Sequence, residues 1–137
     1  MNTFQLAIYE SGGVFYEGLC ESLIIPTDTG DFGIMAHHEN IVCAIVSGTM
    51  MYRLPGEQNK YASVSDGICV MENNKVTILC PAIERPEEID EERARQDILE
   101  AEERMRMKKS QVEYLSAKAM MARNANRLKT KSKYGMH

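Results

Sequence analysis

Residues 81–94, Pro-Ala-Ile-Glu-Arg-Pro-Glu-Glu-Ile-Asp-Glu-Glu-Arg-Ala, join two kinds of sequence. All four prolines, and all glycines except Gly135, lie at or before Pro86. Between Glu87 and Tyr134 the chain contains neither residue type, so nothing there forces the backbone out of a helix. The sequence therefore predicts a β-like part with frequent turns, followed by a helical part.

The helical part is also divided by charge. Its acidic residues lie almost entirely in the first half, and Glu113 is the only acid after Glu103. Residues 1–86 carry a net charge of −6 and residues 87–137 a net charge of +2, within a whole-chain charge of −4. A polarised arm of this kind indicates a moving or docking part rather than a catalytic one.

The composition is that of a soluble globular protein, with 44% hydrophobic and 26% charged residues among 137. A run of about 18 apolar residues, which a membrane span needs, does not occur in the sequence. The first residues, Met-Asn-Thr-Phe-Gln-Leu, lack the basic and apolar segments of a secretory signal, so secretion is not expected.

The cysteines are widely spaced and lie in apolar surroundings, at Cys20, Cys43, Cys69 and Cys80. Because no Cys-x-x-Cys pair exists, a zinc knuckle is not expected. We interpret the four side chains as reduced thiols buried in the strands of a cytosolic domain.

Residues 3–80 read as short strands separated by turns. Alternating apolar and polar residues over 3–8 predict a half-buried first strand. The other expected strands are 14–20, 23–26, 41–47, 49–54, 61–65, 68–71 and 76–80. Proline is expected to stop the second of these at Pro26, and Asp66-Gly67 is a hairpin signal between 61–65 and 68–71. Turn signals at this spacing predict an antiparallel sandwich or barrel.

Two amphipathic helices are expected after Pro86, separated near Ser110. In the first, apolar residues recur every three to five positions, at Ile89, Ala94, Ile98, Ala101 and Met105. In the second, an alanine-rich stripe would let a neighbouring helix approach closely, and consists of Val112, Leu115, Ala119, Ala122 and Ala125.

The sequence Ser110-Gln111-Val112-Glu113 fits a capping box, which marks Ser110 as a helix start and Lys108-Lys109 as the end of the preceding helix. The break contains neither glycine nor proline, so the same residues can also continue as one helix. A hairpin and a single helix of roughly 70 Å are both compatible with this sequence. We therefore hypothesise a switch between the two shapes.

Three stretches resemble one known family, in matching order and spacing. Gly30–Met35 followed by His38 resembles the loop-and-strand signature of the epsilon subunit of rotary F-type ATP synthases. Ala82–Asp90 resembles that family's junction between sandwich and hairpin, and Ile89–Ala94 matches its bacterial nucleotide-contacting motif (Ile/Leu)-Asp-x-x-Arg-Ala. The resemblance covers essentially the whole chain. It implies a mainly β plus α fold, with an N-terminal antiparallel β-sandwich over 1–84 and a C-terminal antiparallel two-helix hairpin over 85–137.

The chain departs from the family pattern at two places. Ala36-His37-His38-Glu39-Asn40 stands where members commonly have Pro-Gly-His-x-Pro, and Pro86 stands where alanine is frequent. Adjacent histidines on a strand point to opposite faces, so we expect a loop role for His37 and His38 rather than a metal site. No P-loop, nucleophile elbow or His-Glu-x-x-His motif occurs, and no catalytic residues are expected.

The resemblance implies a non-catalytic central-stalk subunit of a proton-transporting ATP synthase. Its sandwich is expected to bind the gamma subunit and the rotor c-ring. Its hairpin is expected to restrain ATP hydrolysis by unfolding toward the catalytic alpha and beta subunits. Such a subunit meets the membrane only through the complex, peripherally, at the cytoplasmic face of the bacterial plasma membrane, and requires no cofactor.

The resemblance also implies ATP as a regulatory ligand of the hairpin. The implied contacts are Glu84, Ile89, Asp90, Arg93, Ala94, Arg123 and Arg127. Arg123 and Arg127 lie four residues apart on one helix face, and guanidinium groups suit phosphate oxygens. Glu100 stands where some ATP-binding relatives have a basic residue, so weak binding is expected.

Other interpretations of the same residues stay open. The Ile89–Ala94 segment also fits a plain helix start, in which Asp90 and Arg93 form an exposed pair worth about 0.2–0.5 kcal/mol. A β-barrel with a basic tail over Lys118–Lys133 would bind nucleic acid, although the acidic sandwich and the scarcity of aromatic residues in the tail argue against it. A structural adaptor with a permanently closed hairpin is the third reading.

Overall fold

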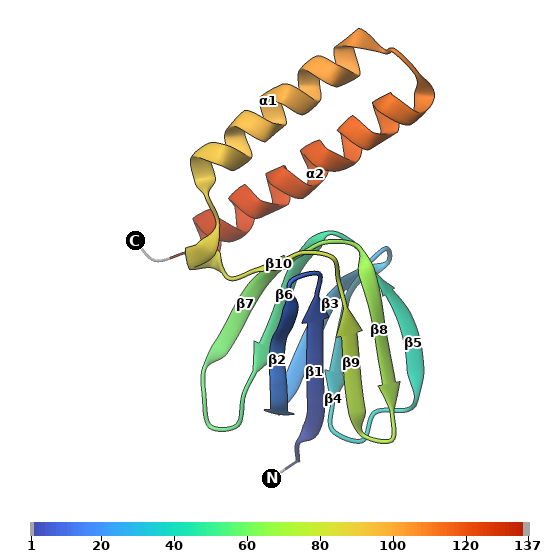
Figure 1. Ribbon diagram of the computed structural model, residues 1–137. Helices are drawn as coiled ribbons and strands as arrows, with labels where there is room; N and C mark the ends of the chain where they lie inside the picture. The colour runs from blue at the N-terminus through green and yellow to red at the C-terminus, as the bar shows by residue number, and fades with distance from the viewer. Residues whose placement is uncertain (1, 136–137) are drawn as a thin grey trace. The chain divides into compact units, whose positions relative to one another are not determined.

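A computed structural model of the protein describes residues 2–135. The chain divides into two compact units, Met1–Glu84 and Arg85–His137, which we call the sandwich unit and the helical unit. The first consists of two packed β-sheets and the second of a helical hairpin (Figure 1). The expected fold class, a β-sandwich followed by a two-helix hairpin, is therefore confirmed.

Within the described residues, the sandwich contains two five-stranded sheets. Sheet A has the order β2 (Gly13–Cys20), β1 (Phe4–Glu10), β9 (Lys75–Leu79), β8 (Gly67–Glu72) and β5 (Ile41–Ile45). Sheet B has the order β10 (Ile83–Glu84), β7 (Asn59–Val64), β6 (Gly48–Arg53), β3 (Ser22–Thr27) and β4 (Gly30–Met35). Neighbouring strands are antiparallel except β1 and β9, which are parallel.

The two sheets enclose one apolar core. The expected alternation in β1 is confirmed, since Phe4, Leu6 and Ile8 are at most 1% exposed. Side chains of both sheets join them, including Leu23 and Ile25 of β3. Each fully buried side chain of this size stabilises the fold by about 1.5–3 kcal/mol.

The predicted hairpin at Asp66-Gly67 is wrong, because β7 belongs to sheet B and β8 to sheet A. The Asp66 carboxylate accepts hydrogen bonds from the backbone N–H of Ser47 at 2.8 Å and from its hydroxyl at 3.2 Å. These bonds hold two crossings between the sheets together. A Cβ atom on Gly67 would collide with the carbonyl oxygen of Leu79, so close packing requires this glycine.

Pro26 does not stop β3, which continues to Thr27. The register of β3 with β6 covers Ser22–Ile24, whereas its register with β4 continues to Thr27. Proline is therefore tolerated at this point, where the strand is paired on one side. The Pro26 carbonyl accepts a hydrogen bond from Val46 N–H at 3.0 Å, which accounts for the end of β5 at Ile45 rather than at the predicted position 47.

Residues 81–86, at the start of the stretch that joins the two kinds of sequence, contain the short strand β10, which pairs with β7. Ser65 N–H donates to the Ala82 carbonyl, and Ala82 N–H donates to the Ser65 hydroxyl, each at 3.0 Å. These bonds satisfy backbone groups that a solvated linker would leave to water. The chain then forms a short 3-10 helix, η1 (Pro86–Glu88), within the helical unit.

The helical unit contains α1 (Glu91–Met107) and α2 (Gln111–Tyr134), so the predicted break near Ser110 is confirmed. The Ser110 hydroxyl accepts a hydrogen bond from Glu113 N–H at 3.0 Å, as expected for a helix N-cap. The Glu113 carboxylate, however, pairs with Arg104 of α1 at 2.8 Å instead of completing the capping box. Lys108, which ends α1, adopts the left-handed conformation with φ 47° and ψ 45°.

The apolar stripe predicted for α1 is confirmed, but the one predicted for α2 is wrong. Ala94 and Ala101 of α1 are completely buried. On α2, Val112 is 78% and Leu115 is 51% exposed, and the three alanines of that stripe are also exposed. The buried residues of α2 are Ala117, Asn124 and Thr130. The packed face of α2 is partly polar, so apolar periodicity did not identify it.

Candidate regulatory site in the helical unit

An ion pair between the two helices fixes how they align. Arg104 Nε lies 2.8 Å from Glu113 Oε1, and Arg104 Nη1 lies 3.6 Å from the Met120 sulfur. The hydrogen bond and charge of Arg104 hold the pKa of the Glu113 carboxyl below its ordinary value, while Glu113 raises the pKa of Arg104. The separate stripes and capping pattern in the sequence gave no indication of this pair, because its two partners lie on different helices.

This alignment brings the predicted arginines to the level of the predicted nucleotide motif. The helices run antiparallel, so residues before Arg104 on α1 lie beside residues after Glu113 on α2 (Figure 1). Ala94 precedes Arg104 by about ten residues, and Arg123 and Arg127 follow Glu113 by about ten to fourteen. The antiparallel hairpin thus groups the motif and both arginines near the α1 N-terminus.

The start of α1 is held by a side-chain cap. Asp90 is the N-cap residue, and its Oδ1 accepts a hydrogen bond from Arg93 N–H at 3.0 Å. Such caps are typically worth about 1 kcal/mol. The Arg93 side chain turns instead toward Asp97, with Nε 3.9 Å from Oδ1, and is 72% exposed. Asp90 therefore caps the backbone at Arg93 instead of forming an exposed side-chain pair with it.

The two apolar members of the motif are buried. Ile89 is 3% exposed and Ala94 is 0% exposed. The small Ala94 side chain lets α1 pack closely on a neighbouring element. η1 also contacts α2, so the N-terminal end of the helical unit is packed rather than frayed. The Arg85 N–H donates to Glu88 Oε1 at 2.9 Å and closes the first turn of η1.

The two arginines of α2 have different surroundings. Arg123 is exposed, whereas Arg127 is partly buried and donates from Nη1 to Asn124 Oδ1 at 2.8 Å. Asn124 is 5% exposed and in turn donates from Nδ2 to the Met120 carbonyl at 2.9 Å. Asn124 is thus a structural link that the sequence did not reveal, because a lone asparagine in a helix carries no positional signal.

Six of the seven predicted contacts belong to the helical unit. The seventh, Glu84, is the last residue of β10 in the sandwich unit and is partly buried. Glu100, predicted to weaken ATP binding, is exposed on α1.

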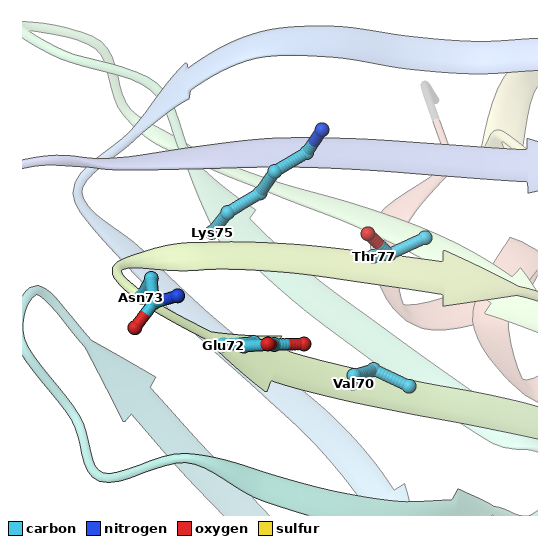
Figure 2. A pocket seen from close by; sticks show the side chains of 5 residues that line it. All are labelled: Val70, Glu72, Asn73, Lys75 and Thr77. Carbon is cyan, nitrogen blue, oxygen red and sulfur yellow. The ribbon is translucent and has the colours of Figure 1, made fainter.

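The hollows on the described part of the sandwich include two that lie along the strands of sheet A. One, of about 330 Å³, is lined by Val70, Glu72, Asn73, Lys75 and Thr77 along β8, its turn and β9 (Figure 2). The other, of about 460 Å³, lies where β1 and β9 end and β8 begins.

The histidine loop holds its shape through neighbouring backbone and amide groups. His37 N–H donates to Asn74 Oδ1 at 2.8 Å, and Asn74 Nδ2 donates to the Thr3 carbonyl at 2.9 Å. The His38 ring packs edge-on against Phe32.

Across residues 2–135, no three His, Cys, Asp or Glu side chains come together as a metal site. Among those residues, too, no helix combines the length and apolar character needed to cross a bilayer.

Two relatives align with nearly the full length of the chain. It is 41% identical over 133 residues to the ATP synthase epsilon chain of Caldanaerobacter subterraneus subsp. tengcongensis, covering 96% of each chain. It is 36% identical over 129 residues to the ATP synthase epsilon chain of Caldicellulosiruptor bescii, covering 94% of this chain and 93% of that one.

Solved structures share the fold at low sequence identity. A chain of the Euglena gracilis mitochondrial ATP synthase, in an assembly of OSCP, F1 and c-ring, aligns with a TM-score of 0.79 at 17% identity. The alignment covers 92% of this chain and 79% of that one. A chain from the central stalk and c-ring of the Tetrahymena thermophila mitochondrial ATP synthase aligns with a TM-score of 0.63 at 11% identity, covering 93% and 95%.

Two family models match in succession and follow the two units of the structure. Residues 3–86 match the β-sandwich domain of the ATP synthase delta/epsilon chain, and residues 87–132 match its long α-helix domain. The chain therefore belongs to the ATP synthase delta/epsilon chain family, and both domains of that family are present in it.

Proposed function

We propose that the protein is a non-catalytic subunit of the central stalk of a bacterial F-type ATP synthase, where it couples ion flow through the rotor to ATP synthesis. The observation that carries this proposal is the family match over both units in succession. In this role the protein lies peripherally at the cytoplasmic face of the plasma membrane. It meets the membrane through its partners, the gamma subunit and the c-ring.

The outer face of sheet A is suited to bind the gamma subunit. The strand registers place five outward side chains in one row across the sheet, Val14, Tyr9, Leu79, Ile68 and Ala44. We call this set the Leu79 row. Val14 is 59%, Leu79 49% and Ile68 39% exposed. Contiguous apolar surface of this kind marks protein interaction sites.

The helical unit is proposed to restrain ATP hydrolysis by opening toward the alpha and beta subunits. Lys108 is held in the left-handed conformation, which costs a non-glycine residue about 1–2 kcal/mol. A continuous helix would release that strain and would break the contact between Arg104 and Glu113. The strain at Lys108 favours the open form and the contacts between the helices favour the closed form, so a partner or ligand that binds one form more tightly shifts the balance toward it.

The exposed surface of α2 fits an acidic partner. Lys118, Arg123, Lys129 and Lys133 are exposed along this helix. Their charge would be attracted to acidic segments of the catalytic subunits, and such attraction weakens as salt increases. The exposed stripe that begins with Val112 and Leu115 would supply apolar contact in the open form.

ATP is proposed to bind weakly at the N-terminal end of the closed hairpin. Arg123 would contact phosphate directly, whereas Arg127 would first have to release Asn124. Ligand bound across both helices would stabilise the closed form by mass action. Isothermal calorimetry on the full chain should detect millimolar binding that Arg123→Ala weakens and Lys118→Ala does not. Absence of heat at millimolar ATP would remove this part of the proposal.

The regulatory role is tested by ATPase assays of the assembled enzyme. Full-length protein is compared with protein that ends before Glu87, which retains the complete sandwich core. Loss of the helical unit should raise ATP hydrolysis several-fold while the complex remains assembled. Unchanged hydrolysis would identify the hairpin as a fixed adaptor. If neither the full-length nor the truncated protein assembled with the enzyme, the stalk role would be rejected.

A further inference from the structure

We propose that Cys43 and Cys69 form a thiol pair that peroxide converts into a disulfide between β5 and β8. This modification site is independent of the proposed stalk function. Cys43 lies on β5, the edge strand of sheet A, and Cys69 lies on the neighbouring strand β8.

The strand register places these cysteines directly opposite each other. Cys43 pairs with Cys69 in the antiparallel ladder between β5 and β8. Directly opposite residues have Cα atoms about 4.5 or 5.5 Å apart, and both separations lie in the range that disulfides use. The side chains of such a pair project from the same face of the sheet.

That shared face is the inner one. Cys69 is completely buried in the core, and Cys43 is partly buried and packs against it. The neighbours of Cys43 on β5, Val42 and Ala44, are exposed on the opposite face. The two thiols lie close enough for each to shift the pKa of the other. Little movement is therefore needed for the two sulfurs to bond.

The other cysteines have different neighbours. Cys80 follows β9, where the ladder continues from the Ile68–Leu79 pair toward Gly67, so Cys80 lies diagonal to Cys69. Diagonal pairs have Cα atoms about 7–8 Å apart, which is beyond ordinary disulfide reach. Cys20 instead donates hydrogen bonds to the carbonyls of Ser22 and Arg53, at 3.2 and 3.3 Å.

Cys43 is the member that reacts first. Burial raises the pKa of Cys69 to about 12. Burial also raises the pKa of Cys43, but the neighbouring Cys69 thiol opposes this shift, and Cys43 is the more exposed of the two. The thiolate is the reactive form of cysteine, so the pair reacts slowly at neutral pH and responds to sustained oxidant.

The reaction is a two-electron oxidation by hydrogen peroxide. The Cys43 thiolate attacks one peroxide oxygen, the O–O bond breaks, and Cys43 becomes a sulfenic acid while hydroxide leaves. The Cys69 sulfur then attacks the Cys43 sulfur, and the S–O bond breaks as the S–S bond forms. The Cys69 proton leaves with the departing oxygen as water. Two thiols and one peroxide thus give one disulfide and two waters.

The disulfide would link the edge strand β5 covalently to β8. The segment from Cys43 to Cys69 passes through β6 and β7 of sheet B, so the bond would close a loop that spans both sheets. Closing such a loop restricts the unfolded chain and resists opening of the edge strand. The outward-facing residues next to the pair, Ala44 and Ile68, belong to the Leu79 row. The oxidised form should therefore hold that row more rigidly.

The test uses the full-length folded chain and hydrogen peroxide. After treatment, remaining thiols are alkylated and the peptides are mapped by mass spectrometry. We expect a Cys43–Cys69 linked peptide that dithiothreitol reverses, and a rise of about 5 °C or more in the thermal midpoint of the sandwich. Cys43→Ser should lose both effects, whereas Cys20→Ser should keep both.

Several results would overturn the proposal. These are a link between Cys69 and Cys80, dimers joined through Cys43, and Cys43 oxidised to sulfinic acid without any link. Two reduced thiols in the treated folded chain would also reject it. Because the peptide map is made on the unaltered chain, it decides the matter even where Cys43→Ser fails to fold, and Cys43→Ala then serves as the second variant.

Discussion

The conformation of Lys108 differs between the closed hairpin and a continuous helix. Its φ of 47° and ψ of 45° suit glycine better than lysine. We expect Lys108→Gly to stabilise the closed hairpin by about 1 kcal/mol, because glycine adopts this conformation without the side-chain clash. The same change disfavours a continuous helix by about 1 kcal/mol. Denaturant unfolding of the full chain, monitored by the circular dichroism of its helices, measures the stabilisation of the closed hairpin.

Lys109→Gly is the matched control for this change. Lys109 follows in the same connection and is not among the residues with positive φ. Glycine there should leave the hairpin unchanged or weaken it, since it only adds freedom to the unfolded chain. Equal stabilisation by both variants would show that Lys108 is not the strained position.

The ion pair of Glu113 with Arg104 makes the hairpin sensitive to acid. The hydrogen bond and charge of Arg104 lower the pKa of Glu113 from its ordinary 4.5, so the folded state favours the carboxylate. The stabilisation is therefore complete above 4.5 and is lost as pH falls through that value and the lower folded pKa. Glu113→Gln should be less stable than the natural chain at neutral pH, and the difference should shrink in acid.

Glu103→Gln is the control for the acid response. Glu103 pairs with Arg106 at 3.6 Å on the surface of α1, where both side chains are about 70% exposed. Exposed pairs of this kind contribute little to stability. The unfolding curve of Glu103→Gln should follow that of the natural chain at every pH. A pH-independent difference for Glu113→Gln would contradict the role assigned to its charge.

At the scale of whole elements, local patterns predicted most strands and the helix break but not how they associate. Asp66-Gly67 has the composition of a hairpin turn, yet its place is decided by hydrogen bonds to Ser47, nineteen residues away. Similarly, the bonds between Ser65 and Ala82 lead into strand β10, within the stretch that joins the two kinds of sequence. Partners this distant in the sequence leave no local signal.

The packed face of α2 eluded prediction for a related reason. Apolar periodicity points to the stripe of Val112 and Leu115, both more than half exposed. The face that is buried includes Asn124, whose side chain is satisfied by the Met120 carbonyl and by Arg127. Polar residues are tolerated in a packed face when their hydrogen bonds are complete. The family resemblance therefore implied the hairpin, but the apolar pattern did not identify the side of α2 that closes it.

Two alanines on α2 separate these faces experimentally. Ala117 is buried and Ala119 is exposed, although they lie two residues apart on one helix. We expect Ala117→Glu to destabilise the hairpin by about 2–3 kcal/mol, since it places an unpaired charge in a packed face. Ala119→Glu should change stability by less than about 0.5 kcal/mol. If Ala119→Glu destabilised the hairpin more than Ala117→Glu did, the predicted stripe would be the packed face.

At the scale of the whole molecule, the change of sequence character at Pro86 coincides with a change of structural unit. The sandwich is built from contacts among strands, and the hairpin from one antiparallel helix pair. The nucleotide motif was predicted from the family resemblance. In the structure, its residues also stabilise the helical unit. Asp90 caps α1, and Ile89 and Ala94 are buried. The proposed ATP contacts and the observed structural roles thus fall on the same residues, so substitutions there need stability controls.

We expect the Leu79 row to contribute to binding of the gamma subunit. Leu79 is 49% exposed within an apolar row that crosses all five strands of sheet A. Burying such a side chain in an interface contributes about 1.5–3 kcal/mol, so Leu79→Glu should weaken gamma binding roughly 10- to 100-fold.

Leu99→Glu is the matched control, because Leu99 of α1 is 64% exposed and lies outside the sandwich. Its affinity in a pull-down titration with purified gamma subunit should equal that of the natural chain. Equal binding by the Leu79 and Leu99 variants would assign the gamma interface to another face. Because a charge on an already exposed side chain leaves the core intact, the melting curves of both variants should match the natural one, and lost binding then reports on the interface alone.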